Sequence, residues 1–192
     1  MESSEELVLS AIYARRSIRK FISGKPVERN KLETLLKAAM AAPSACNIQP
    51  WDFIIIEDEE SIRALQDGID QYADYNPTVI IVICGNNEFI PWKDHGVVDC
   101  ACAMENIMIA APVIGLGTVC IGGFDRRKVK GQLAIPEDIE AIGMLYVGYP
   151  DEEKQPRTKY TEEAVHWGKY DGKRTRKPRP GSILEFGPEA SL

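Results

Sequence analysis

Apolar positions along the chain switch between helical spacing and strand-like runs. Helical spacing predicts helices at residues 3–14, 26–40, 59–69, 97–111 and 127–133. Short runs rich in β-branched residues predict strands at residues 51–56, 78–84, 118–121 and 141–147. Strands that alternate with helices predict an α/β or α+β domain built around one sheet.

Local signals mark where some of these helices begin. Ser3 and Glu6 have the spacing of a capping box, in which each side chain accepts a hydrogen bond from the other residue's backbone N–H. Pro26 suits the first position of the second helix, because a proline there leaves no N–H unpaired. The stretch at 97–111 is long, apolar and rich in Ala and Met, which predicts a buried central helix.

The chain changes character after about Pro150. Prolines and scattered charges dominate there, with one compact apolar group at 183–186 and too little apolar surface for a second domain. The segment is either a disordered end or an arm that packs on a partner subunit, since Trp167, Tyr170 and residues 183–186 need something to bury against. We expect a domain at residues 1–168 and a C-terminal arm at 169–192.

The charge balance limits the partners. The chain of 192 residues has 23 Lys and Arg against 29 Asp and Glu, a formal net charge of −6. This charge disfavours binding of nucleic acid through the basic tail at 169–179, and binding to an anionic membrane. The acidic N-terminus does not fit a signal peptide, and apolar runs such as 79–84 fall short of a membrane span, which together predict a cytoplasmic protein.

Cysteine and histidine usage bears on redox state and metals. Five cysteines, an odd number spread through apolar stretches, predict reduced and mostly buried thiols. The two histidines, His95 and His166, have no ligand-spaced partners, so we expect no structural metal.

A basic segment, residues 15–20 with the sequence Arg-Arg-Ser-Ile-Arg-Lys, is the first candidate for chemistry. Guanidinium groups match phosphate oxygens, and a serine hydroxyl adds a further contact. The segment could bind a phosphate or an acidic partner, or its cations could simply complement the C-terminus of a helix.

Three later segments add polar groups. The loop at residues 43–51, with two prolines and two side-chain amides, suits the edge of a flat heterocycle, although it could be an ordinary helix–strand connection. Gly115-Leu116-Gly117 precedes a strand, which excludes a dinucleotide fingerprint. Gly122-Gly123 at that strand's end allows close approach of a ligand or forms a simple turn. The cluster at 154–159 is basic and could be a solvated linker.

Taken together and in this order, these segments resemble the nitroreductase family of flavoproteins, from about residue 12 to residue 167. The resemblance implies a central mixed, mainly antiparallel sheet flanked by helices, in an intertwined homodimer with an extended C-terminal arm. It also implies FMN as the cofactor. The segment at 85–96 is short for the family's lid, which leaves Phe89 or Trp92 to cover the flavin.

The resemblance also implies roles for individual residues. Arg15, Ser17 and Arg19 match the residues that hold the phosphate, ribityl chain and pyrimidine edge of FMN, with Arg16 beside them. The loop that reaches the isoalloxazine from the other subunit matches Pro43, Ser44, Ala45 and Asn47, with Gln49 close by. Backbone groups beside the flavin ring match Ile121, Gly122 and Gly123. The late basic residues that close on the phosphate match Arg157 and Lys159.

The implied activity is transfer of hydride from NAD(P)H and of electrons to a nitroaromatic, quinone or similar small acceptor in a ping-pong cycle. No catalytic side-chain acid or base is expected, because the cofactor carries the chemistry. The alternatives are an enzyme of the same fold with other chemistry, such as reductive dehalogenation or flavin destruction, and a flavin-binding redox sensor without turnover.

Overall fold

The structure is a computed structural model that describes residues 3–67, 69, 75–86, 95–156 and 160–173. Two compact units make up the chain, Met1–Arg157 and Thr158–Leu192. The second unit contains, in its described part, the short 3₁₀ helix η2 (Glu162–Ala164) and a stacked pair formed by His166 and Tyr170. Trp167 and Tyr170 are exposed there, and the apolar group at 183–186 lies outside the described residues.

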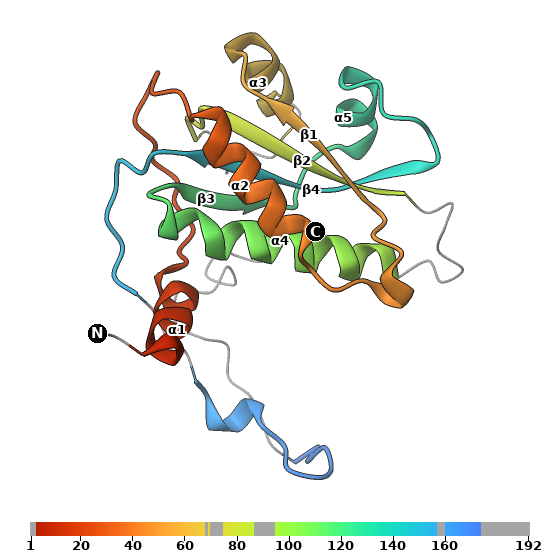
Figure 1. The fold of residues 1–192 in the computed structure, drawn as a ribbon. Helices are drawn as coiled ribbons and strands as arrows, with labels where there is room; N and C mark the ends of the chain where they lie inside the picture. Colours follow the sequence, from red (N-terminus) through yellow and green to blue (C-terminus); the bar gives the residue numbers. More distant parts are fainter. Residues whose placement is uncertain (1–2, 68, 70–74, 87–94, 157–159, 174–192) are drawn as a thin grey trace. The chain divides into compact units, whose positions relative to one another are not determined.

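A four-stranded sheet forms the centre of the first unit, in the order β1-β2-β4-β3 (Figure 1). All three strand pairs are antiparallel. The strands are β1 (Trp51–Ile56), β2 (Val79–Asn86), β3 (Gly117–Ile121) and β4 (Ile139–Gly148). The four predicted strands are therefore confirmed, and the mainly antiparallel α+β fold with them.

Helices cover both faces of this sheet, so its central strands are buried on both sides. The helices are α1 (Ser4–Ala14), α2 (Arg29–Met40), α3 (Glu59–Gln66), α4 (His95–Val113) and α5 (Arg126–Gln132), with a short 3₁₀ helix η1 (Ala45–Asn47). Ile80 and Val82 of β2 face one core together with residues of α3 and α5. Ile81 and Ile83 face the other core together with residues of α2 and α4.

The predicted helices form, but α2 begins later than expected. The capping box of α1 is present, with Ser3 N donating to Glu6 Oε2 at 2.8 Å and Glu6 N donating to Ser3 Oγ at 3.2 Å. Pro26, predicted at the start of α2, lies before it, because the helix begins at Arg29 after an extended Glu28. Burial of Val27, which is 4% exposed, explains the difference, since an extended chain places this side chain in the core.

The helix α4 is the long central helix that the sequence predicts. By length and composition alone, its stretch Gly96–Val113 could cross a membrane. One side of it packs on the sheet, where Cys100, Ala103 and Ile107 are fully buried as in a core helix. Another part of its surface leaves Val97 and Val98 exposed.

The helix α1 contrasts with α4 because it buries none of its residues. Leu7, Val8 and Ile12 are all exposed, although α1 lies against α4. Exposed apolar side chains thus lie on α1 and, at a separate place, at the start of α4.

Candidate functional site

The basic segment follows α1 in an extended conformation. α1 ends at Ala14, and its last turn contains no basic residue. Ser17 pairs in parallel with Thr118 of β3, and the backbone N–H of Ile18 donates to the Thr118 carbonyl at 2.8 Å. The effect of a helix dipole is confined to the last turn, so a helix terminus does not account for Arg16 and Arg19. The segment instead lines the outer edge of the sheet.

Two glycines allow the segment to lie so close to the sheet. A Cβ on Gly117 would lie 2.8 Å from Cβ of Ile18, and one on Gly148 would lie 2.9 Å from Cδ1 of Phe21. Both distances are shorter than real side-chain contacts, so glycine is required at these two crossings.

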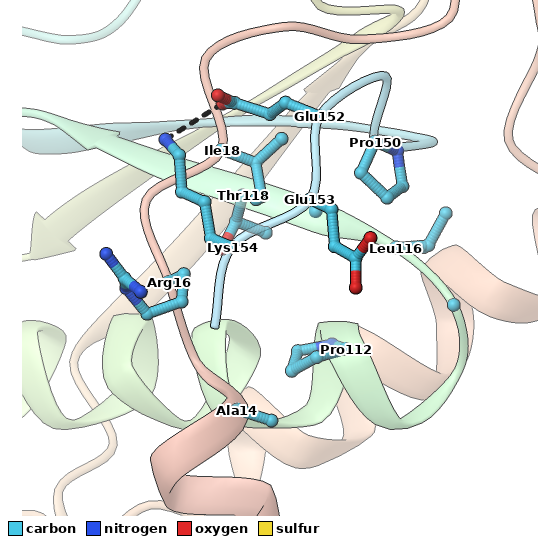
Figure 2. Close-up of a pocket in the computed structure, with 12 residues that line it drawn as sticks. Ala14, Arg16, Ile18, Pro112, Leu116, Thr118, Pro150, Glu152, Glu153 and Lys154 are labelled. Carbon is cyan, nitrogen blue, oxygen red and sulfur yellow. Dashed lines mark ion pairs between the residues drawn. The ribbon is translucent and has the colours of Figure 1, made fainter. Parts of the chain in front are cut away.

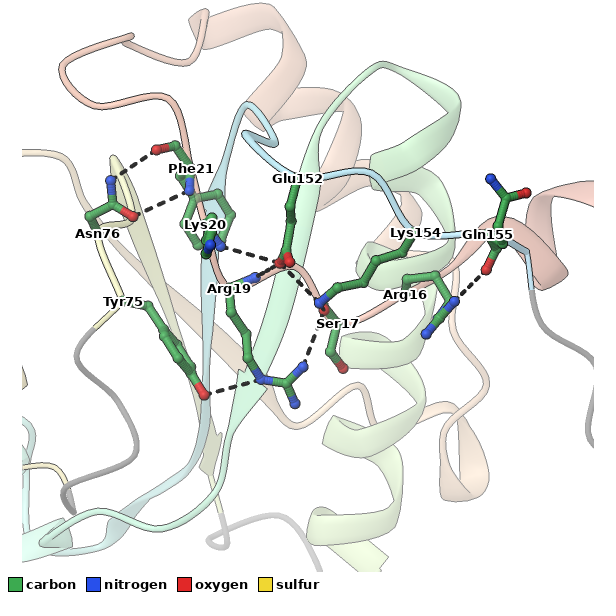
Figure 3. A network of polar contacts seen from close by, with 10 residues as sticks. All are labelled: Arg16, Ser17, Arg19, Lys20, Phe21, Tyr75, Asn76, Glu152, Lys154 and Gln155. Carbon is green, nitrogen blue, oxygen red and sulfur yellow. Dashed lines mark hydrogen bonds and ion pairs between the residues drawn. The ribbon is translucent and has the colours of Figure 1, made fainter. Parts of the chain in front are cut away.

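The arginine side chains of the segment have different partners, and Figure 3 shows those of Arg16 and Arg19. Arg15 lies 3.4 Å from Glu105 of α4, and the Arg16 guanidinium donates to the Gln155 carbonyl. Arg19 donates to the Tyr75 hydroxyl at 3.1 Å and to the Ser17 carbonyl at 3.3 Å. The cations are therefore spread along the edge of the sheet, which suits an elongated ligand with an anionic end better than a single small anion.

Glu152 and Lys154 attach the chain after β4 to this segment. The Glu152 carboxylate accepts the backbone N–H groups of Arg19 at 2.5 Å and of Lys20 at 3.3 Å, and it lies 2.9 Å from Lys154 Nζ. Lys154 Nζ also donates to the Ser17 carbonyl at 2.6 Å. Burial alone would raise the pKa of Glu152, but the Arg19 N–H and the Lys154 ammonium bring that pKa below its ordinary value.

Tyr75 and Asn76 hold the same segment from the side of β2. The Asn76 amide accepts from Phe21 N at 3.2 Å and donates to Phe21 O at 2.8 Å, as a neighbouring strand would. Tyr75 packs edge-on against the buried Tyr146, with ring centroids 6.4 Å apart, and fixes Arg19. These two partners could not be predicted from the sequence, because an isolated Tyr-Asn pair carries no recognisable motif.

A small cavity lies where the basic segment, the end of α4, β3 and the chain after β4 meet (Figure 2). Its volume is about 200 Å³, and Arg16, Lys154, Glu152 and Glu153 are its charged lining residues. Pockets that enclose a drug-sized ligand measure about 300–1,000 Å³, so this cavity is too small to enclose a flavin. Of the predicted ligand-binding residues Arg16 lines it, whereas Arg15, Ser17 and Arg19 do not.

Gly122 and Gly123 follow directly from β3, on the same sheet edge as the basic segment. Both are exposed, whereas Ile121 before them is 8% exposed and packs in the core. A Cβ on Gly122 would meet no atom within 4 Å. The backbone at this strand end is therefore open to a ligand, while the Ile121 side chain is directed away from it.

The loop at 43–51 lies at the other edge of the sheet, where it leads into β1. Three of its non-glycine residues have left-handed backbone angles, with φ of 51° at Cys46, 56° at Asn47 and 54° at Gln49. Ser44 Oγ accepts from Gln49 N at 3.0 Å, and the Gln49 amide donates to Asn47 Oδ1 at 3.1 Å. The loop is thus internally braced, and Pro43, Asn47 and Gln49 are exposed.

The structure brings the first and third predicted segments together and keeps the loop apart from both. β2 and β4 separate β1 from β3, and three spacings of about 4.8 Å amount to about 14 Å across the sheet. Arg157 and Lys159 lie outside the described residues, as do Phe89 and Trp92. Their predicted roles stay predictions.

The cysteines buried in the core are unreactive. Burial raises the pKa of Cys84 to about 11 and that of Cys100 to about 12, so both stay protonated at neutral pH. All five cysteines are free, but Cys46 and Cys120 are exposed and Cys102 is half-buried, so the expectation of mostly buried thiols holds only for Cys84 and Cys100. In the part of the chain that is described, no three metal-binding side chains cluster.

Comparison with known proteins gives the family. A profile of the nitroreductase family matches residues 12–81 and 70–149. A protein of Archaeoglobus fulgidus named for NADH dehydrogenase and NAD(P)H nitroreductase activity is 34% identical over 175 residues, covering 86% of this chain and 99% of that protein. The FMN reductase (NAD(P)H) of Bacillus subtilis is 26% identical over 83% of this chain and 72% of that protein.

A solved structure agrees with these sequence matches. The FMN-dependent nitroreductase of Clostridium difficile has a TM-score of 0.75 and 27% identity to this chain, and the match covers 84% of this chain and 99% of that one. Matching sequence over residues 12–149, together with the matching fold, shows that the protein belongs to the nitroreductase family.

Proposed function

We propose that the protein is an FMN-dependent oxidoreductase that takes hydride from NAD(P)H and passes electrons to a nitroaromatic, quinone or similar small acceptor in a ping-pong cycle. The observation that carries the proposal is the donor set along one sheet edge. This set contains three guanidinium groups and the Ser17 hydroxyl, on the same sheet edge as the open backbone at Gly122. Within the described part of the chain, the Ser17 hydroxyl makes no hydrogen bond. The names of the relatives in Bacillus subtilis and Clostridium difficile support FMN as the cofactor.

These residues fit FMN by their chemistry. Arg15, Ser17 and Arg19 would together hold the phosphate, ribityl chain and pyrimidine edge, with Arg16 beside them, because arginine and hydroxyl groups are matched donors for phosphate oxygens. Arg19, fixed by Tyr75, would place a positive charge beside the pyrimidine edge, and the Gly122 and Gly123 N–H groups would point at the ring. When bound, FMN supplies the hydride and electron chemistry. The side chains then act by binding and orientation, without an acid or base.

The protein is proposed to work as a homodimer in which the loop at 43–51 of one subunit contacts the flavin held by the other. The loop lies at the opposite sheet edge from the basic segment, so a single chain leaves each half of the site without its complement. The exposed apolar side chains on α1, and those at the start of α4, are two places that a second copy could cover. The C-terminal arm would pack on that copy.

The test uses the purified full-length protein. We expect a yellow protein with the visible spectrum of bound flavin, a dimer by light scattering, and rapid anaerobic bleaching by NADH or NADPH. A colourless protein that does not take up added FMN would contradict the proposal. Bound flavin that neither nicotinamide bleaches would favour the redox-sensor alternative instead.

A further inference from the structure

Asp99 of α4 is a buried carboxylate that contacts the loop at 43–51. It is 5% exposed, and its two oxygens lie 3.2 and 3.1 Å from the backbone nitrogen of Ala45, which donates to them. We propose that Asp99 is the positioning residue that holds this loop in the conformation needed to contact the flavin. The inference rests on the proposed function for the role of the loop, and on the observed contact for the role of Asp99.

The loop needs an outside partner at this point. Ala45 is the first residue of η1, and Ser44 occupies the N-cap position, where a serine hydroxyl would usually accept from the first turn. Here Ser44 Oγ accepts from Gln49 N instead and makes no capping bond. Asp99, 54 residues further along the chain, takes over the capping role.

The conformation that Asp99 supports is strained. Cys46 and Gln49 have positive φ, which is unfavourable for such side chains, whereas Asn47, also at positive φ, tolerates a left-handed backbone. Such a loop persists only where the surrounding contacts hold it in place. Besides Asp99, the Pro50 carbonyl accepts from Asn86 N at 2.8 Å and fixes the far end.

Asp99 is itself held firmly. The neighbouring Cys100 is fully buried, and its Sγ lies 3.6 Å from the Cys84 carbonyl of β2. Within the described residues no Lys or Arg forms an ion pair with Asp99. The hydrogen bond from the Ala45 N–H is therefore the main interaction that offsets the lost hydration of its carboxylate. Burying a carboxylate costs free energy of folding, so an apolar side chain at this position would stabilise the core more. Its use here therefore favours a role in shaping the loop over a role in core stability.

The experiment compares Asp99→Leu and Asp99→Asn with wild type. Leucine has a similar size and removes the acceptor, while asparagine keeps one acceptor oxygen without the charge. Asp138→Asn is the matched control, since Asp138 is exposed in the turn before β4. In flavin-free protein, we expect the amides of Ala45 and Asn47 to exchange hydrogen at least about tenfold faster in Asp99→Leu.

With FMN added, we expect the dissociation constant to rise about tenfold in Asp99→Leu and less in Asp99→Asn, with a changed visible spectrum of the bound flavin. The control is expected to match wild type in both measurements. Asp99→Asn serves as the informative variant if the leucine variant does not fold.

Two results would overturn the inference: unchanged exchange at Ala45 and Asn47, or faster exchange with unchanged FMN affinity and spectrum. Failure of wild type to bind FMN would contradict the proposed function instead. The exchange measurement on flavin-free protein would then still decide whether Asp99 holds the loop.

Discussion

Gly117 lies where the basic segment crosses the first residues of β3, and the space for a side chain there is already taken by Ile18. The position of Arg15, Ser17 and Arg19 thus depends on a residue that has no side chain. Small residues of this kind set the distance between a binding segment and the sheet that supports it.

Gly117→Ala should push the segment away from β3. The added Cβ would lie 2.8 Å from Ile18, so we expect a loss of stability of about 1–3 kcal/mol, typical of overpacking, together with weaker FMN binding. Urea unfolding and flavin titration measure the two effects. Gly131→Ala is the control, because a Cβ there meets nothing within 4 Å and alanine favours the helix α5. Equal stability of the two variants would contradict the prediction.

Arg19→Ala should weaken flavin retention. Loss of one charged donor from a phosphate or ring contact corresponds to about a 10- to 100-fold rise in the FMN dissociation constant. Dialysis followed by absorbance measures the remaining flavin. Arg29→Ala removes an exposed guanidinium from α2, which pairs with Glu33 of the same helix, and should retain flavin like wild type. Unchanged flavin occupancy in Arg19→Ala would rule out its assignment.

At the residue scale, the sequence indicated the donors but not the groups that hold them. The arginines and Ser17 form a contiguous segment with recognisable chemistry. Glu152 contacts Arg19 across 133 residues, and Asp99 contacts Ala45 across 54. A single carboxylate carries no local pattern that predicts such a distant partner, so only the folded chain reveals it.

At the scale of elements, the strands were predictable because buried β-branched runs have few other structures open to them. β2 is the clearest case, with helices over both faces. The start of α2 was not predictable from the sequence. The preference of proline for a helix start competes there with the burial of Val27, two residues before the helix begins. Tertiary packing decided that boundary.

The segment after β4 should respond to pH through Glu152. Because the pKa of Glu152 is below its ordinary 4.5, its contribution to stability is present above pH 4.5 and is lost as pH falls through the lowered pKa. Glu152→Gln should therefore destabilise the protein at pH 7, by about 1–2 kcal/mol, and less in acid. Urea unfolding at pH 7 and in acid measures this difference. Glu153→Gln is the neighbouring control, and the same pH dependence in both variants would contradict the prediction.

At the scale of the molecule, the two halves of the candidate site lie at opposite sheet edges, while α4 touches both of them. Asp99 of α4 holds the loop, and Glu105, six residues later, pairs with Arg15. Six residues of helix span about 9 Å, so the two contacts are on one rigid element. The sequence could not predict this arrangement without the family resemblance, because strand order is not encoded by any one strand.

The separation of the two halves has a consequence for mixtures of damaged subunits. In the proposed homodimer, a mixed pair of one subunit altered in the basic segment and one altered in the loop at 43–51 would contain one wholly intact site and one doubly damaged site. Random exchange makes about half of the dimers mixed, so two inactive variants refolded together should regain about a quarter of wild-type activity. Two variants altered in the same half should regain none. Two inactive variants of one chain would then complement each other.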